Sequence, residues 1–138
     1  MAACNPNITL HVYFWRLDES ISLPPILLDV VDFTLKVAGN GNITGDAFIG
    51  ATRLSPVTGT CRPITRPNGN VLTLEFNWRL VDIFLLVFTY PVGAATLLRG
   101  RFIAQDAVAI PVDFDKGLAV VLTPPDPGET GTATGSQT

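Results

Sequence analysis

Short runs of alternating apolar and polar residues, separated by turn residues, extend from Ile8 to Thr123, and no useful length of chain has helical periodicity. Because successive side chains of a strand point to opposite faces, a period of two is typical of half-buried β-strands. The clearest case runs from Leu72 to Leu80, where Leu, Phe and Trp alternate with Thr, Glu, Asn and Arg. We therefore expect an all-β protein.

Charged residues are scarce, at 15% of the 138 residues, against about a quarter in typical globular domains. Open sheets often protect their edges with charged side chains, whereas a closed barrel has no edges. Gly39–Asn42 and Pro67–Asn70 mark tight hairpin turns. We therefore predict that residues 1–123 form one domain, a single antiparallel up-and-down β-barrel of about eight strands.

The segments of this barrel follow from the pattern. Leu17–Pro25 is expected to be a connection or a lid. Ile83–Tyr90 is apolar on both faces, which predicts that one face points into the lumen and that the other is buried in a subunit interface. Pro124–Thr138 has no large apolar residue, which predicts a disordered tail. The predicted strands are Ile8–Trp15, Val31–Val37, Ile43–Leu54, Thr58–Thr65, Leu72–Leu80, Ile83–Tyr90, Ala94–Gln105 and Leu118–Leu122, with a short extended piece at Ala107–Ile110.

Composition argues against several classes of function. The net charge is −3 and the few cations are scattered, so nucleic acid is not an expected partner. The longest charge-free run, Ile83–Leu98, contains Pro91 and Gly93 and is too short and broken for a helical membrane span. The chain begins without the basic and apolar segments of a signal peptide, which leaves the compartment open between the cytoplasm and a mature secreted form.

Motifs that bind phosphate or a dinucleotide, or that hold a nucleophile, do not occur in the sequence. We therefore predict no cofactor and single out no catalytic residue. The two cysteines, Cys4 and Cys61, lack the spacing of metal ligands, and with a single histidine they predict no metal site. They are either one disulfide between the amino-terminal segment and a central strand or two free thiols, and one pair does not decide between these.

Two polar strand faces are candidates for function. His11, the one histidine, shares a face with Tyr13 and Trp15, and this face lines either the mouth of a cavity or the outer wall. On the other strands, inward-pointing polar residues would orient a carbonyl or carboxylate, while outward-pointing ones would form ordinary cross-strand charge pairs. This second set comprises Glu75, Asn77, Arg79, Arg99 and Arg101.

Part of the chain, Gly41 to Gly100, resembles the middle of avidin-type barrels. The matching segments are the hairpin Gly41–Gly45, the short strand Pro56–Thr60, and Leu74–Trp78 with its terminal Asn-Trp pair. The resemblance implies an eight-stranded barrel, often tetrameric, with a ligand in its open end and Trp78 in its aromatic wall. The tyrosine donor position of that family falls on Ala47, so biotin is not the expected ligand.

The same outline also resembles the barrels of allene oxide cyclases, dirigent proteins and spirotetronate cyclases. That resemblance implies an apolar lumen that folds a reactive substrate, where catalysis by confinement needs few conventional catalytic residues.

Three functions follow as expectations. The first is binding of an apolar small molecule in the lumen, the second is a cofactor-free cyclase or isomerase using the same lumen, and the third is a structural or assembly protein with a filled barrel. Sparse charge and the apolar Ile83–Phe88 also predict a homo-oligomer. The predicted binding residues are Trp78, Phe76, Phe88 and Phe102 as walls, with His11, Tyr13 or Arg101 as a polar handle.

Overall fold

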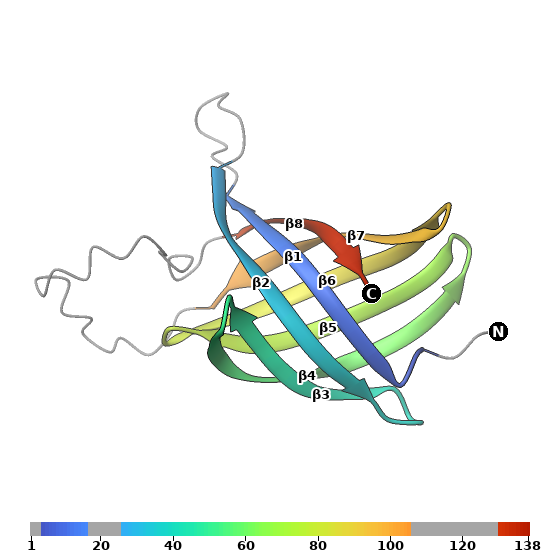
Figure 1. Cartoon of the computed structure of the whole chain (residues 1–138), viewed down its shortest axis with the longest axis horizontal. Coiled ribbons are helices and arrows are strands. Elements are labelled where there is room, and N and C mark those ends of the chain that lie inside the picture. The colour runs from blue at the N-terminus through green and yellow to red at the C-terminus, as the bar shows by residue number, and fades with distance from the viewer. Residues whose placement is uncertain (1–3, 17–25, 106–129) are drawn as a thin grey trace, which may run out of the picture.

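The computed structural model describes residues 4–16, 26–105 and 130–138, and within them the chain is all-β. Eight strands in these ranges pair antiparallel in chain order, and the last pairs with the first, so the sheet closes into an up-and-down barrel (Figure 1). The predicted fold class is confirmed. The strands are β1 (Asn7–Arg16), β2 (Ile26–Val37), β3 (Asn42–Ile49), β4 (Thr52–Thr65), β5 (Asn68–Trp78), β6 (Val81–Val92), β7 (Ala95–Ala104) and β8 (Thr130–Gln137).

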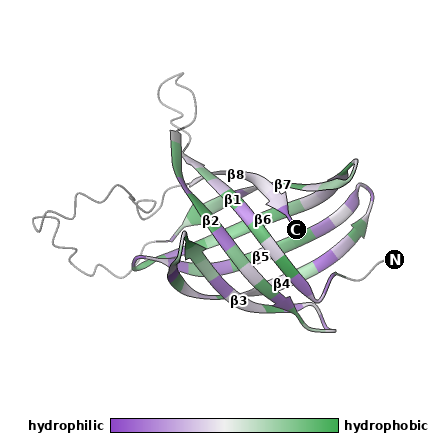
Figure 2. Cartoon of the chain, in the orientation of Figure 1, coloured by the Kyte–Doolittle hydropathy of each residue, from purple (hydrophilic) through white to green (hydrophobic). Residues whose placement is uncertain are grey.

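Hydrophobic and hydrophilic residues alternate in bands along the strands (Figure 2). Burial alternates along the strands as well, with one set of side chains inside the barrel and the other on its outer wall. Strand β1, for example, buries Ile8, Leu10, Val12 and Phe14, all at most 1% exposed. Burial of such side chains is the main favourable term in folding. The described part of the chain offers no helix that could traverse a bilayer.

The two ends of the barrel are built differently. We call the end where β1 begins and β8 ends the terminal end, and it also carries the β2–β3, β4–β5 and β6–β7 turns (Figure 1). The opposite end carries the tight β3–β4 and β5–β6 turns. Arg79 and Leu80 form the β5–β6 turn with positive φ angles of 50° and 75°, so the predicted strand ends at Trp78 rather than at Leu80.

The prediction of a disordered tail was wrong for its last part. Thr130–Gln137 is strand β8, which pairs with β7 on one side and β1 on the other and closes the barrel. At Gly131 the strand has no room for a side chain, because the ring of Phe102 lies only 2.5 Å from where a Cβ of residue 131 would lie. The strand predicted to close the barrel, Leu118–Leu122, and the piece Ala107–Ile110 lie outside the described residues.

A second correction concerns the predicted strand Ile43–Leu54. The structure divides it at Gly50–Ala51, where the chain turns from β3 into β4. Gly50 has a φ of 59°, a left-handed conformation that glycine adopts without steric cost. Small residues at this point therefore marked a hairpin turn rather than a bend within one strand.

Candidate functional site

A cluster of aromatic rings fills the lumen toward the opposite end. Phe14 lies at its centre, with ring centroids 5.3 Å from Phe102 and 5.5 Å from Trp78. Phe76 stacks 6.5 Å from Trp78 and meets Phe33 at 5.1 Å. Each of these side chains is at most 2% exposed. Three predicted wall residues, Trp78, Phe76 and Phe102, therefore do face the lumen together, but they belong to a packed core in which each of them meets the ring of Phe14.

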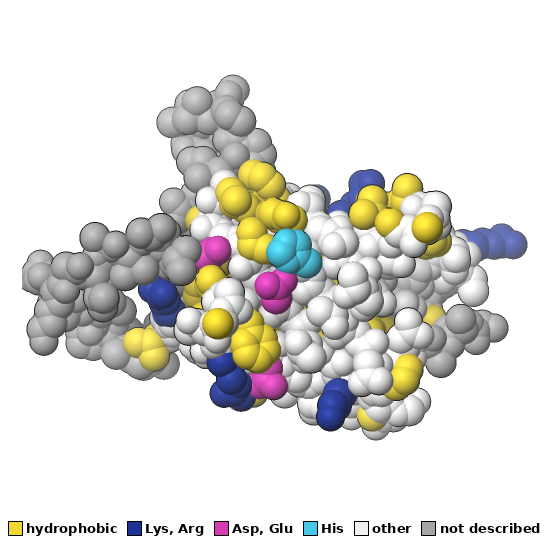
Figure 3. Space-filling view, in the orientation of Figure 1, with side chains coloured by type: hydrophobic (Ala, Val, Ile, Leu, Met, Phe, Trp, Pro, Cys, Tyr) yellow, Lys and Arg dark blue, Asp and Glu magenta, His cyan; other side chains and the backbone are white. Residues whose placement is uncertain are grey.

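The other predicted binding residues lie on the outer wall. His11 and Tyr13 alternate with the buried Leu10, Val12 and Phe14, and Figure 3 shows the histidine at the surface beside an acidic group. That group is Asp32, whose Oδ1 lies 2.5 Å from the His11 Nδ1. The face of His11, Tyr13 and Trp15 is thus part of the outer wall and not of a cavity mouth.

Phe88 and Arg101 also point outward, because their neighbours Val87 and Phe102 are the buried ones. The expectation that these residues share a pocket with Trp78 was therefore wrong. When a strand is apolar on both faces, its sequence does not indicate which face points into the lumen. In β6 the β-branched Val87 points inward, and Phe88 points outward.

The polar set on β5 and β7 follows the outward alternative. Glu75, Arg99 and Arg101 are exposed, and the cross-strand neighbours of Arg101 are Leu86 and Thr132, neither of them charged. Asn77 instead stabilises the β5–β6 turn, accepting a hydrogen bond from the Leu80 amide at 2.8 Å and donating to Asp82 at 3.2 Å. These side chains therefore form no inward constellation for a carboxylate.

One buried polar atom stands out among the rings. The Nε1 of Trp78 is buried and has no hydrogen-bond partner, although a buried indole N–H usually finds one. Leaving a buried donor unpaired costs about 1–3 kcal/mol. Trp78 therefore offers an unpaired donor to a ligand in this part of the lumen, where the Oδ2 of Asp29, across from Phe14 on β2, is likewise buried without a partner.

At the terminal end, the inner wall changes from apolar to polar. Going toward this end, the inward residues of β5 and β6 pass from Leu72 to Asn70 and from Val87 to Thr89. A cavity of about 330 Å³ lies here, lined by β4–β8 and by Asn5 of the amino-terminal segment. We call it the mouth cavity. Its volume falls in the range of small-molecule sites, roughly 300–1,000 Å³.

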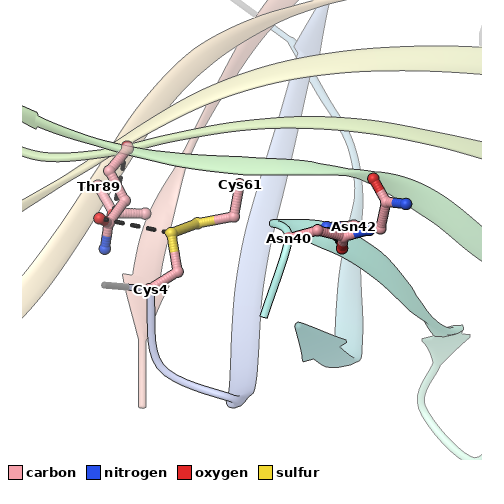
Figure 4. The surroundings of a disulfide bond; sticks show 6 residues. Cys4, Asn40, Asn42, Cys61 and Thr89 are labelled. Atoms are coloured by element: carbon pink, nitrogen blue, oxygen red, sulfur yellow. Dashed lines mark hydrogen bonds between the residues drawn. A yellow bond between two sulfur atoms is a disulfide. The ribbon is translucent and has the colours of Figure 1, made fainter. Parts of the chain in front are cut away.

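A disulfide between Cys4 and Cys61 closes the side of this end (Figure 4). Cys61 points inward from β4, and Cys4 Sγ lies 3.7 Å from the Oδ1 of Asn70. The adjoining Pro6 carbonyl accepts a hydrogen bond from the Val37 amide at 2.9 Å. The disulfide alternative of the sequence is thus the correct one, and it fixes Asn5 beside the mouth cavity.

The outer wall of β5–β7 carries an apolar stripe. Leu86 is 53% exposed at its centre, and Phe84 and Phe88 flank it along β6. Phe88 stacks on Tyr90 with centroids 5.6 Å apart, and Arg99 lies 5.4 Å over the Tyr90 ring. A groove of about 470 Å³ runs beside the stripe toward β8.

No family model, curated protein or solved structure matches this chain. The resemblance to avidin-type and cyclase-type barrels therefore stays a prediction beyond the barrel itself. Within the described residues, no group of three or more His, Cys, Asp or Glu side chains is placed to hold a metal ion.

Sequence reasoning missed the mouth cavity. Its signal was present in the alternating strands, where the inward series of apolar residues ends with Asn70 on β5 and with Thr89 on β6. A polar residue in the position of the next apolar one marks the point where a barrel interior opens. Asn70 falls in the predicted hairpin turn Pro67–Asn70, whereas the structure places that turn at Arg66–Pro67 and Asn70 in β5. Thr89 falls in the predicted strand Ile83–Tyr90, where it was not distinguished from its apolar neighbours.

Proposed function

We propose that the protein is a self-associating β-barrel with a filled lumen, whose copies meet through the outer wall of β5–β7. The observation that carries the proposal is the exposed Leu86 at the centre of the stripe formed with Phe84 and Phe88. Contiguous exposed apolar surface on a soluble protein is typical of a contact with another molecule. This is the assembly function among the three that the sequence left open.

A second copy fits this wall because its charges are divided between the two flanks of the stripe. In the sheet, Glu75 of β5 pairs with Phe84, while Arg101 of β7 pairs with Leu86 in the next row. A twofold axis running along β6 brings β5 of one copy over β7 of the other. Each Glu75 then lies opposite the Arg101 flank of the partner, and the two stripes bury each other.

Charge reversal tests this arrangement, with sedimentation velocity at micromolar concentration as the measurement. We expect the unaltered protein to be a dimer and Glu75→Arg or Arg101→Glu to be monomeric. In each variant, like charges face one another at both of the symmetry-related positions of the dimer. The double variant Glu75→Arg/Arg101→Glu restores opposite charges and should restore the dimer. Lys36→Glu, on the outer face of β2, is the matched control and should leave the dimer intact.

Two results would refute the proposal. One is an unaltered protein that sediments as a monomer at tens of micromolar. The other is a double variant that stays monomeric although both single variants and the double variant keep the β-type circular dichroism of a folded barrel.

Binding of an apolar small molecule in the lumen is the second candidate, and the unpartnered Nε1 of Trp78 favours it. A ligand with a hydrogen-bond acceptor would satisfy this donor, with Phe76 and Phe102 as walls. The cyclase alternative would use the same place by confinement. Because the rings pack closely, such a ligand must displace some of them from the lumen.

This candidate is tested in a Trp15→Phe background, where Trp78 is the one tryptophan left. An apolar fluorescent probe should quench Trp78 emission with about micromolar affinity, roughly −8 kcal/mol, and Trp78→Phe should weaken probe binding. A probe that leaves the emission unchanged at tens of micromolar would show that the rings are only a core.

A further inference from the structure

The inner wall of the barrel ends in polar side chains on four neighbouring strands at the terminal end. Asn70 of β5 lies directly across from Thr89 of β6, and Thr96 of β7 lies directly across from Gln137 of β8. Thr89 is buried, at 1% exposure, in a position equivalent to the apolar residues deeper in the lumen. The two pairs lie in successive rows of the inner wall, because Thr89 lies across from Leu98 on β7 and Thr96 lies across from Pro91 on β6. Together the four polar side chains form a polar rim around this part of the mouth cavity.

The hydrogen bonds of this rim are incompletely satisfied within the protein. The Oε1 of Gln137 is buried and has no hydrogen-bond partner. The Thr89 hydroxyl reaches the Asn70 carbonyl oxygen only at 3.5 Å, near the limit of a hydrogen bond. Buried polar groups in native proteins are normally paired. The rim therefore presents an acceptor at Gln137 and a weakly engaged hydroxyl at Thr89 to whatever enters the cavity.

Charge is missing from the mouth cavity. None of the described residues that line it is Asp, Glu, Lys, Arg or His. A carboxylate or an ammonium group placed there would lose its hydration without gaining an opposite charge, which is strongly unfavourable. Amide and hydroxyl side chains each offer donors and acceptors, which suits a ligand with several hydroxyl groups.

We infer that the mouth cavity binds a neutral, polyhydroxylated molecule the size of a monosaccharide. Its volume of about 330 Å³ accommodates one sugar ring, and hydroxyl groups satisfy both the Gln137 acceptor and the Thr89 hydroxyl. The site lies at the end of the barrel and does not depend on the proposed dimer, which uses the outer wall of β5–β7. The disulfide contributes by holding Asn5 at the edge of the cavity.

The test is a titration of the ¹⁵N-labelled protein with glucose, galactose, mannose and N-acetylglucosamine, followed by NMR. We expect saturable shifts of the backbone amides of Asn70, Thr89 and Gln137 with at least one of these sugars. Glucuronate, which adds a carboxylate to the same ring, should bind much more weakly. The methyl glycoside of the bound sugar distinguishes a free monosaccharide from the end of a glycan as the ligand. It binds only if the site accepts a sugar that is linked to a further group, as in a glycan.

Two variants remove the polar groups while keeping the shape of the wall. Thr89→Val and Gln137→Leu should each weaken binding about fivefold or more, the loss of one hydrogen bond. Thr58→Val, on the outer face of β4, is the matched control and should bind as the unaltered protein does. The spectra themselves show whether each variant is folded.

The inference is overturned if none of the four sugars gives saturable shifts at the rim. It is also overturned if glucuronate binds as tightly as the neutral sugars, or if both folded variants bind them unchanged.

Discussion

Replacing both cysteines with alanine should lower the free energy of unfolding by about 4 kcal/mol. The disulfide joins residues that are 57 positions apart. In the chain-entropy model a crosslink over that separation removes about 14 cal/mol/K from the unfolded chain, or about 4 kcal/mol at 25 °C. Alanine adds no buried polar group at position 61, where the native side chain is 6% exposed, so the estimate reflects the crosslink.

Denaturation in guanidinium chloride measures this loss directly, and the slope of the transition provides a second readout. Without the crosslink the unfolded chain is less compact, so the double variant should also show a larger m-value. The melting temperature should fall by roughly 15 °C for a chain of this size. Reductant should produce the same changes in the unaltered protein and none in the double variant.

A loss below about 1 kcal/mol, with the disulfide confirmed in the unaltered protein, would refute this reasoning. It would mean that the amino-terminal segment is held near β4 even in the unfolded chain, or that closing the mouth strains the barrel by as much as the crosslink stabilises it. Reductant that destabilises the double variant would instead reveal an effect unrelated to the disulfide.

The packing of the core and of the surface lead to two further predictions. Phe14→Ala, at the centre of the ring cluster and 0% exposed, should cost about 3–5 kcal/mol in chemical denaturation, and a cost near zero would show that the rings repack. Arg53→Ala removes an exposed ion pair, 2.7 Å from Asp46, and should change stability by less than about 1 kcal/mol. A larger loss there would indicate a wider network.

Alternation predicted the barrel well because every second side chain of a strand points into the lumen and is apolar there. Ile8 to Phe14 and Leu72 to Trp78 followed the period, and each has its apolar set inside. The period does not say which set faces inward where both are apolar, as in β6. Phe88 was therefore assigned to a site that it does not reach. On β7 the period does distinguish the faces, because the exposed Arg99 and Arg101 alternate with the buried Leu98 and Phe102, so Arg101 was assigned to the site against its own pattern. Turn chemistry was more reliable at Gly39–Asn42 than at Gly50, where no Asn accompanied the glycine.

The site was harder to predict than the fold, because it depends on where each strand stops. Asn70 and Gln137 are 67 residues apart in sequence numbering, and β7 and β6 lie between their strands in the closed sheet. Nothing local to either residue indicates that they share a rim. Closure itself brings them together, and that closure depends on β8, the strand that composition alone assigned to a disordered tail.

The groups around strand β8 leave little room for side chains on its inner face, and this can be tested at Gly131. A Cβ there would lie 2.1 Å from the Trp15 carbonyl oxygen and 2.5 Å from the Phe102 ring, so neither β1 nor the core can accept a larger residue without moving. Gly131→Val should therefore destabilise the barrel by about 3 kcal/mol or more.

Ser136→Val provides the matched control, because it adds the same side chain on the outward face of β8. It should change stability by less than about 1 kcal/mol. If instead both valine variants unfold at the same denaturant concentration as the unaltered protein, the ring of Phe102 can move to accommodate a larger residue at position 131. The small residues of β8 would then reflect the demands of the outer wall rather than those of the core.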